Sequence, residues 1–307
     1  MMQNKAKKID YVFSGNETVD GAGVRLRRMF GGHSSAVITD PFLLLDHFGS
    51  NDPKEYLSGF PWHPHRGIET VTYLMEGKVV HEDSEGHKGT IYPGDIQWMT
   101  AGSGIFHQEM PKPLDEKNPE EAMKLTGMPT SVVGLQLWIN LPANQKMTKP
   151  AYRSITGPQT PVIDDDSGNR IRIVAGHYGS QEGVLTGQTR VDPTYLEISM
   201  PEESEFRFTV NAGYTSIINT LAGTVYAGSN EADVTPRSAV VFSQAGDEIV
   251  LKTDEERARF ILLSGKPLHE PIYWYGPIVM NSQNQIEEAL LDLRRNTFVR
   301  EKEPIFQ

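Results

Sequence analysis

The sequence predicts an all-β protein made of two antiparallel β-barrel domains and a short C-terminal helix. Its 307 residues are enough for about two domains, and its 28 glycines and 20 prolines favour a turn-rich β architecture over a helical bundle. Short apolar runs are separated at close intervals by turn-forming residues, which is typical of sandwiches and barrels. The two halves also resemble each other, since residues 73–80 correspond to residues 219–226 and residues 92–102 to residues 235–246. A duplicated β unit explains this repeat.

The first half contains a regular series of predicted strands. They cover residues 42–47, 69–75, 78–83, 88–92, 96–100, 104–110 and 131–141. Only residues 118–126 predict a helix in this half, because Asn118 can cap it and a proline follows at the first helical position. Residues 142–151 are polar and flanked by prolines, the composition of an inter-domain linker. We therefore expect an N-terminal domain over residues 1–142 and a C-terminal domain over residues 143–307.

The second half repeats the strand pattern and ends differently. Its predicted strands cover residues 170–175, 194–200, 206–210, 214–221, 224–227, 239–242, 247–252 and 259–263. Residues 284–296 place Ile286, Leu290 and Leu293 on one helical face, with acidic residues early and arginines late. This pattern predicts an amphipathic C-terminal helix.

Composition and charge exclude several classes of protein. The chain has no cysteine, so disulfides, thiolate nucleophiles and cysteine-bound metals are excluded, and any metal must bind to histidine or carboxylate groups. The net charge of −11 disfavours direct binding to nucleic acid. No segment approaches the roughly 18 apolar residues of a membrane span, and the N-terminus lacks the apolar core of a signal peptide. We expect a soluble, cytoplasmic protein that binds neither nucleic acid nor membranes.

Two pairs of potential metal ligands indicate a metal site. His63 and His65 are two residues apart, so in an extended segment both imidazoles point to one face. His107 and Glu109 repeat this spacing 42 residues after His65. Antiparallel strands can direct both pairs to one interior point. Three neutral nitrogens and one carboxylate there suit Fe(II), and also Mn, Ni, Cu or Zn.

A single His-x-His pair is weak evidence for a metal. With nine histidines in the chain, such a pair arises by chance and is commonly a surface or core residue pair. Two further observations favour the metal. One is the second pair at His107, and the other is the turn formed by Gly89, Pro93, Gly94 and Asp95 between the two pairs.

Longer motifs around these residues resemble a known family. The segments Phe-Pro-x-His-Pro-His-Arg-Gly (60–67), Gly-Asp-Ile-Gln-Trp-Met-Thr-Ala-Gly (94–102) and Ile-x-His-x-Glu-Met-Pro (105–111) are similar to pirin motifs. Residues 43–49, 135–142, 265–271 and 276–281 are similar as well. Pirins are a branch of the cupin superfamily. The general cupin motifs are matched less closely, because a long insertion precedes His107 in the second of them.

The resemblance implies a bicupin of two jelly-roll barrels, with one metal ion, usually iron, in the N-terminal barrel. Carried over to this sequence, the metal ligands are His63, His65, His107 and Glu109. Glu69 occupies the acidic position of the general cupin motif and competes with Glu109 for the fourth place. The spacing from His107 and the pirin pattern favour Glu109. The corresponding segments of the second half carry no histidine, so the C-terminal barrel is expected to bind no metal.

The resemblance also implies a function. Pirins resemble quercetin 2,3-dioxygenases, in which a flavonol binds an open metal position, a glutamate removes its 3-hydroxyl proton and dioxygen cleaves the heterocycle. Here Glu109 would be both ligand and catalytic base, Fe(II) the cofactor, and a small aromatic flavonol the substrate. The alternative is a redox-responsive regulatory protein that acts through protein partners, as a transcriptional co-regulator does. The acidic charge suits protein partners better than DNA.

Overall fold

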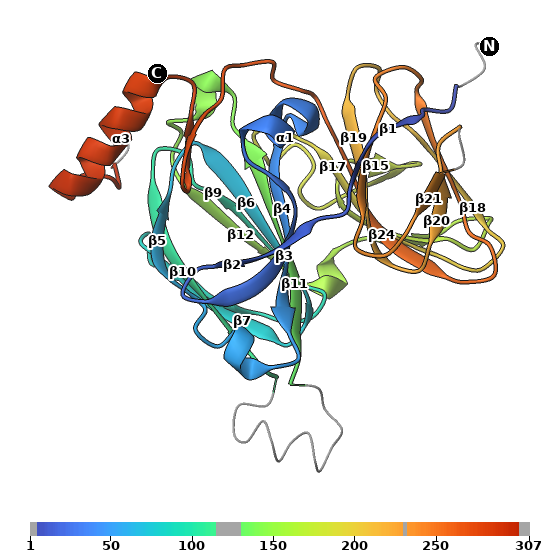
Figure 1. The fold of residues 1–307 in the computed structure, drawn as a ribbon, viewed down its shortest axis with the longest axis horizontal. Coiled ribbons are helices and arrows are strands. Elements are labelled where there is room, and N and C mark those ends of the chain that lie inside the picture. Colours follow the sequence, from blue (N-terminus) through green and yellow to red (C-terminus); the bar gives the residue numbers. More distant parts are fainter. Residues whose placement is uncertain (1–4, 115–129, 230–231, 301–307) are drawn as a thin grey trace. The chain divides into compact units, whose positions relative to one another are not determined.

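The computed structural model describes residues 5–114, 130–229 and 232–300. The helix expected over residues 118–126 lies outside these residues. Contacts divide the chain into two compact units (Figure 1). Unit 1 comprises Met1–Asn16, Met29–Phe42 and Pro158–His269, and unit 2 comprises Glu17–Arg28, Leu43–Gly157 and Glu270–Gln307. Neither unit is continuous in sequence, and residues 270–307 group with the first half of the chain. The linear division at residue 142 stays a prediction.

The described part of unit 2 contains three antiparallel sheets, apart from strand-end residues 16, 29–31 and 42, which group with unit 1. The larger sheet has the strand order β12 (Ala151–Ile155), β9 (Ile96–Thr100), β6 (Ile68–Glu76), β11 (Val132–Asn140), β4 (Phe42–Ser50), β3 (Val24–Gly31) and β2 (Asn16–Asp20). The smaller sheet has the order β5 (Phe60–His65), β10 (Ile105–Lys112), β7 (Lys78–Asp83) and β8 (Lys88–Ile91). A hairpin of β25 (Tyr273–Tyr275) and β26 (Ile278–Met280) completes the unit.

Unit 1 repeats this plan. Its larger sheet has the order β1 (Ile9–Phe13), β22 (Ala239–Phe242), β19 (Thr215–Ala222), β24 (Ala258–Gly265), β17 (Thr194–Met200), β14 (Arg170–Ala175) and β13 (Val162–Asp164). Its smaller sheet has the order β18 (Glu205–Thr209), β23 (Glu248–Lys252), β20 (Val225–Ala227) and β21 (Ala232–Val234). The strands β15 (His177–Tyr178) and β16 (Gln181–Glu182) form a short separate ladder.

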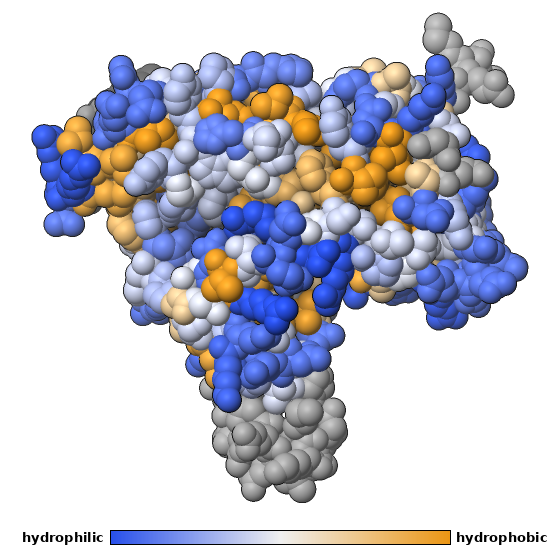
Figure 2. Space-filling view, viewed as in Figure 1, coloured by the Kyte–Doolittle hydropathy of each residue, from blue (hydrophilic) through white to orange (hydrophobic). Residues whose placement is uncertain are grey.

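The helices in the described part of the chain are short apart from the last. They are α1 (His33–Thr39), the 3₁₀ turns η1 (Pro53–Glu55), η2 (Ala143–Gln145) and η3 (Gly157–Gln159), and α3 (Gln283–Arg295). The hydroxyl of Ser282 accepts the N–H of Gln285 at the start of α3, and Asn296 ends the helix in the left-handed conformation. Figure 2 shows hydrophilic residues on the outer edge of this helix and hydrophobic residues beside them, as expected of an amphipathic helix.

The predicted fold class is confirmed, because each unit is built from antiparallel sheets and the chain ends in a short helix. All the predicted strands are present, with bounds shifted by at most a few residues. The sequence analysis missed α1, which has no side-chain cap at Gly32. It also missed the short or edge strands β1, β2, β13, β15, β16, β21, β25 and β26, together with β3, β5 and β12.

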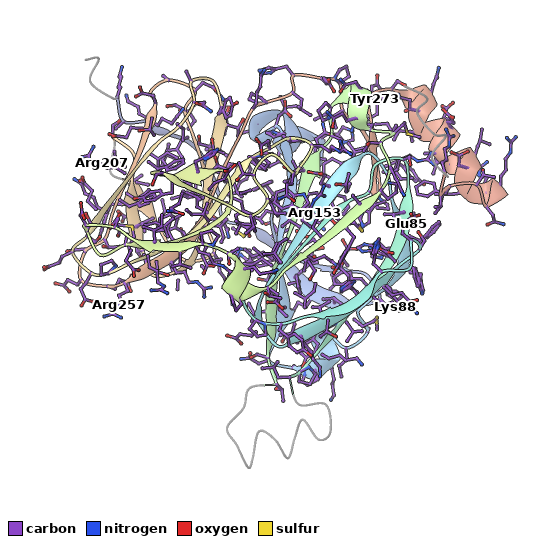
Figure 3. All side chains as sticks on the ribbon, turned by 180° about the vertical axis from the view of Figure 1, so that it is seen from behind. Glu85, Lys88, Arg153, Arg207, Arg257 and Tyr273 are labelled. Carbon is purple, nitrogen blue, oxygen red and sulfur yellow. The ribbon has the colours of Figure 1, made fainter. Side chains whose placement is uncertain are left out.

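The two sheets of unit 1 enclose an apolar core. Buried side chains from both sheets meet there, including Phe206, Leu251, Ile218 and Phe260. The rings of Phe206 and Phe260 pack edge to face with centroids 6.0 Å apart. Arg207 and Arg257 are exposed, and Figure 3 shows both side chains pointing away from the sheets of this unit.

No helix within residues 5–114, 130–229 and 232–300 has the length and apolar composition that a membrane crossing requires.

Replacement of Phe260 by alanine should test this core. The ring is fully buried against Phe206, so its removal leaves a cavity between the sheets and should lower the free energy of unfolding by about 3–5 kcal/mol. Urea denaturation of Phe260→Ala measures the loss. The control is Val162→Ala at an exposed site. A loss below about 1 kcal/mol in Phe260→Ala would contradict the packing described.

Candidate metal centre

The predicted histidine pairs lie on two neighbouring strands of unit 2. Strand β5 carries His63 and His65, and β10 carries His107 and pairs with β5 in antiparallel register. In this register His107 lies opposite His63, and Ile105 lies opposite His65. Alternation along each strand directs all three imidazoles to the same side of the smaller sheet.

The three imidazoles form a compact cluster. The Nε2 atom of His63 lies 3.0 Å from Nε2 of His65 and 2.8 Å from Nε2 of His107. Within the described residues, this is the group whose potential ligand atoms all lie within 4.8 Å of one another. Two ligands that each bind one ion at about 2.1 Å and at a right angle are about 3.0 Å apart. The spacing of the nitrogens therefore fits a shared metal ion.

The protonation state of the cluster also suits a metal. The Nδ1 atom of His63 lies 2.9 Å from the carbonyl oxygen of Pro61 and donates its hydrogen there, which leaves Nε2 with a free electron pair. Burial lowers the pKa of His63, although the Pro61 carbonyl and Asp20 oppose this shift. Burial and the neighbouring imidazoles hold the pKa of His65 and of His107 well below the usual value. Neutral imidazoles are the form that binds metals.

Glu109 lies two residues beyond His107 on the inner side of β10. Its Oε1 accepts a hydrogen bond of 2.9 Å from the hydroxyl of Thr72, which comes from the larger sheet. Burial raises the pKa of Glu109 to about 7, although the bond from Thr72 lowers it. The carboxylate is not part of the compact histidine group. Its role as fourth ligand stays a prediction.

The rival acid, Glu69, lies on the other face of its strand. Glu69 and Thr72 are three residues apart on β6, so their side chains point to opposite faces of the sheet. Glu69 accepts a hydrogen bond of 2.7 Å from the hydroxyl of Thr100. Because Thr72 contacts Glu109, Thr72 lies on the inner face of the sheet. Glu69 therefore lies on the outer face. This geometry supports Glu109 over Glu69 as the acid nearer the histidines.

An aromatic pair that the sequence analysis did not single out borders the cluster. The ring of Trp138 on β11 lies edge-on to the imidazole of His65, with centroids 5.1 Å apart. The ring of Trp274, on the hairpin β25–β26, lies 6.0 Å from that of Trp138. Gln136 and Trp138 alternate with buried apolar residues on β11 and therefore share one face of the strand. Gln136 accepts a hydrogen bond of 2.6 Å from Thr72, the residue that also contacts Glu109, so this face is the inner one. Figure 3 shows Tyr273 of the same hairpin at the surface near α3.

The isolated histidines His81 and His87 have structural partners. The hydroxyl of Tyr152 lies 2.7 Å from Nε2 of His81, and the tyrosine ring stacks on both imidazoles. Nδ1 of His87 lies 2.8 Å from a carboxylate oxygen of Asp83. These contacts give both imidazoles packing and hydrogen-bonding roles outside the histidine cluster.

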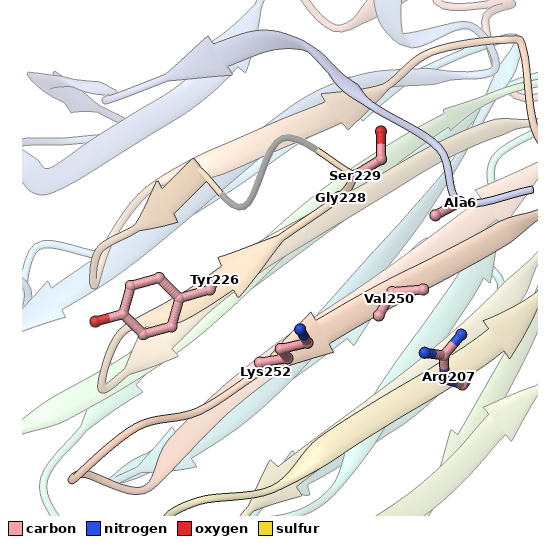
Figure 4. A pocket seen from close by; sticks show the side chains of 7 residues that line it. All are labelled: Ala6, Arg207, Tyr226, Gly228, Ser229, Val250 and Lys252. Carbon is pink, nitrogen blue, oxygen red and sulfur yellow. The ribbon is translucent and has the colours of Figure 1, made fainter.

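Unit 1 offers a different interior. Its described core is filled by aliphatic and phenylalanine side chains. A pocket of about 150 Å³ lies outside that core and is lined by Ala6, Arg207, Tyr226, Gly228, Ser229, Val250 and Lys252 (Figure 4). These residues supply no imidazole or carboxylate ligand.

The first prediction for this centre concerns His65. His65→Ala removes a buried nitrogen from the cluster and should abolish tight metal binding, because two imidazoles remain where three converge. Metal content after equilibration at low micromolar free metal measures the effect. The control is His87→Ala, which removes an imidazole outside the cluster. Full occupancy in His65→Ala would contradict the assignment.

The second prediction concerns stoichiometry. The described core of unit 1 offers apolar side chains instead of ligands, so the full chain should bind about one metal ion. Elemental analysis of the purified protein, referenced to its sulfur content, gives the ratio. A reproducible value of two would show a second site.

Comparison with known proteins places these features in a family. The family model described as pirin matches residues 23–139, and that described as the pirin C-terminal cupin domain matches residues 195–299. A Thermoplasma acidophilum protein named "Putative quercetin 2,3-dioxygenase" is 46% identical over 85% of this chain and 100% of its own length. Human pirin is 36% identical over 97% of this chain and 96% of its own.

A solved structure extends the likeness to three dimensions. The crystal structure of quercetin 2,3-dioxygenase from Acinetobacter baumannii superposes with a TM-score of 0.83 at 34% identity, covering 95% of this chain and 98% of that one. The fold is thus that of two cupin domains. The chain belongs to the pirin family, with an N-terminal pirin domain that carries the three-histidine cluster and a C-terminal pirin cupin domain.

Proposed function

We propose that this chain is an iron(II)-dependent dioxygenase of the quercetin 2,3-dioxygenase type. The observation that carries the proposal is the cluster of three neutral imidazoles in the N-terminal pirin domain, of which His65 and His107 are buried and His63 is half-buried. The names of the Thermoplasma and Acinetobacter relatives support the reaction type. Three imidazoles with one carboxylate suit Fe(II) and also accept Mn, Ni, Cu or Zn. Iron is proposed because the resemblance to pirins implies it.

In this proposal His63, His65 and His107 hold the metal by their Nε2 atoms, with Glu109 as the oxygen ligand. The bound ion would supply an open position at which a flavonol oxygen and dioxygen react. Three neutral imidazoles and one carboxylate leave a divalent ion with a net charge of about +1, so the site attracts an anionic flavonolate.

Glu109 is also the proposed general base. Its carboxylate is buried, and burial raises its pKa to about 7. Its proton affinity is therefore closer to that of a flavonol hydroxyl than is the proton affinity of an exposed carboxylate. The bond from Thr72 holds Oε1 of Glu109. If the carboxylate binds the metal through that oxygen alone, or detaches from the metal, its other oxygen would accept the 3-hydroxyl proton. Trp138 lies beside His65 and offers a flat apolar surface for an aromatic substrate.

Replacement of Glu109 by glutamine tests the base. The amide keeps the shape of the side chain and can still offer an oxygen to a metal, but it cannot accept the proton. Flavonol turnover per bound iron should therefore fall by about 10²–10⁴-fold in Glu109→Gln. Substrate consumption is followed by loss of flavonol absorbance, and carbon monoxide release identifies the ring cleavage.

The matched control is Glu69→Gln, which alters another buried acid, on the face of β6 opposite to that of Thr72. Turnover per iron in this variant should stay within a few-fold of the wild-type value. Equal turnover in Glu109→Gln and wild type would show that Glu109 is not the base. If the iron-loaded wild type consumes no flavonol, the enzymatic proposal fails and the alternative, a redox-responsive protein acting through protein partners, takes its place.

A further inference from the structure

A buried arginine adjoins the proposed metal ligands. Arg66 directly follows His65, and only 1% of its surface is exposed. Its Nε donates to the carbonyl oxygen of Ser103 at 2.7 Å. Its Nη1 donates to a carboxylate oxygen of Asp292 at 2.9 Å, and its Nη2 to the carbonyl oxygen of Phe298 at 2.8 Å. One side chain thus joins the end of β5 to the turn before β10 and to residues 292–300, here called the C-terminal segment.

The position of Arg66 links both ligand strands. Strand β5 ends at His65, and β10 begins at Ile105, its register partner. The bond from Arg66 to Ser103 therefore holds the two strands together at the end that carries His65. The main chain of Arg66 is fixed as well, since its N–H donates to Pro277 at 3.3 Å and its carbonyl accepts from Val279 at 3.1 Å.

The C-terminal segment is built around this guanidinium. Asp292 of α3 pairs with both Arg66 and Arg300. The ring of Phe298 lies under the guanidinium carbon of Arg66 at 4.2 Å, in a cation–π contact. Gly104, just before β10, makes room for Phe298, because a Cβ there would lie 2.4 Å from the Phe298 carbonyl oxygen.

A buried positive charge needs this compensation. A guanidinium presents its donors in a rigid planar fork, and three of its nitrogens are matched here by acceptors from two distant parts of the chain. If Asp292 loses its negative charge, the guanidinium gains by moving toward water. Such a movement pulls on the main chain of Arg66, next to His65, and breaks the hydrogen bond from Arg66 to Ser103.

We propose that Asp292 and Phe298 are positioning residues of the metal centre, which act through Arg66 to hold His65 and His107 in place. The inference rests on metal binding by the histidine cluster and not on flavonol cleavage. Partners that orient metal ligands typically change metal affinity by about 10–100-fold when they are mutated. If the C-terminal segment served only to stabilise the fold, loss of metal affinity would simply follow loss of stability.

Cobalt(II) binding distinguishes these two roles, because its visible spectrum reports ligand geometry without any turnover. The full-length protein is titrated with Co(II) as wild type, Asp292→Asn, Asp292→Glu and Phe298→Leu. The control is Phe260→Leu, which weakens the core of unit 1 and leaves the centre untouched. Thermal denaturation of each metal-free variant gives its Tm.

We expect Asp292→Asn to bind Co(II) about 10–100-fold more weakly, with an altered visible spectrum. Asp292→Glu keeps the negative charge and should retain most of the wild-type affinity. Phe298→Leu should lose less affinity than Asp292→Asn. Phe260→Leu should keep the wild-type affinity and spectrum even where its Tm falls by as much as that of Asp292→Asn.

Wild-type affinity and spectrum in both Asp292→Asn and Phe298→Leu would overturn the inference while leaving the proposed function intact. An equal loss of affinity in Phe260→Leu would overturn it as well, because the effect would then follow stability alone. If wild type itself binds no Co(II) and no other divalent ion, the metal centre fails, and the proposed function fails with it.

Discussion

The antiparallel pairing of β5 with β10 is the interaction on which the candidate metal centre depends. The register sets His63 opposite His107, and the alternation of side chains adds His65 to the same side. Strand β5 contains Pro61 and Pro64, which cannot donate to a neighbouring strand, and β5 lies at the edge of its sheet, where prolines are tolerated. The edge position thus permits a proline-rich ligand strand.

The two units share an architecture and differ in what fills it. The internal repeat aligns Gln97 with Val240 and, continued by one residue before its first segment, Thr72 with Ile218. In the structure Thr72 lies opposite Gln97, and Ile218 lies opposite Val240, so the aligned residues form equivalent cross-strand pairs. The polar pair of unit 2 belongs to a face that binds Glu109, whereas the apolar pair of unit 1 belongs to a closed core. The same framework can therefore hold a polar site or a packed interior.

Much of the fold could be predicted from the sequence, because strand formation here depends on local alternation and turn residues. Strands such as β6, β7 and β9, and the helix α3, appear within a residue of their predicted positions. Strands β5 and β12 were missed. Their prolines or polar residues give no local strand signal, and their extended form depends on ladders to β10 and β9. The helix α1 has no side-chain cap that would mark its start.

For the site, the sequence by itself determined the candidate ligands, because a spacing of two residues fixes which side chains share a face of a strand. Only the tertiary structure decided the rest. It brought His107 to His63 across 44 residues of sequence. It placed Glu109 on the inner face, beside Thr72, and Glu69 on the opposite face, beside Thr100. It also joined Arg66 to Asp292 across 226 residues. These outcomes depend on the register and direction of strands and on long-range charge pairing, which no local pattern of residues encodes.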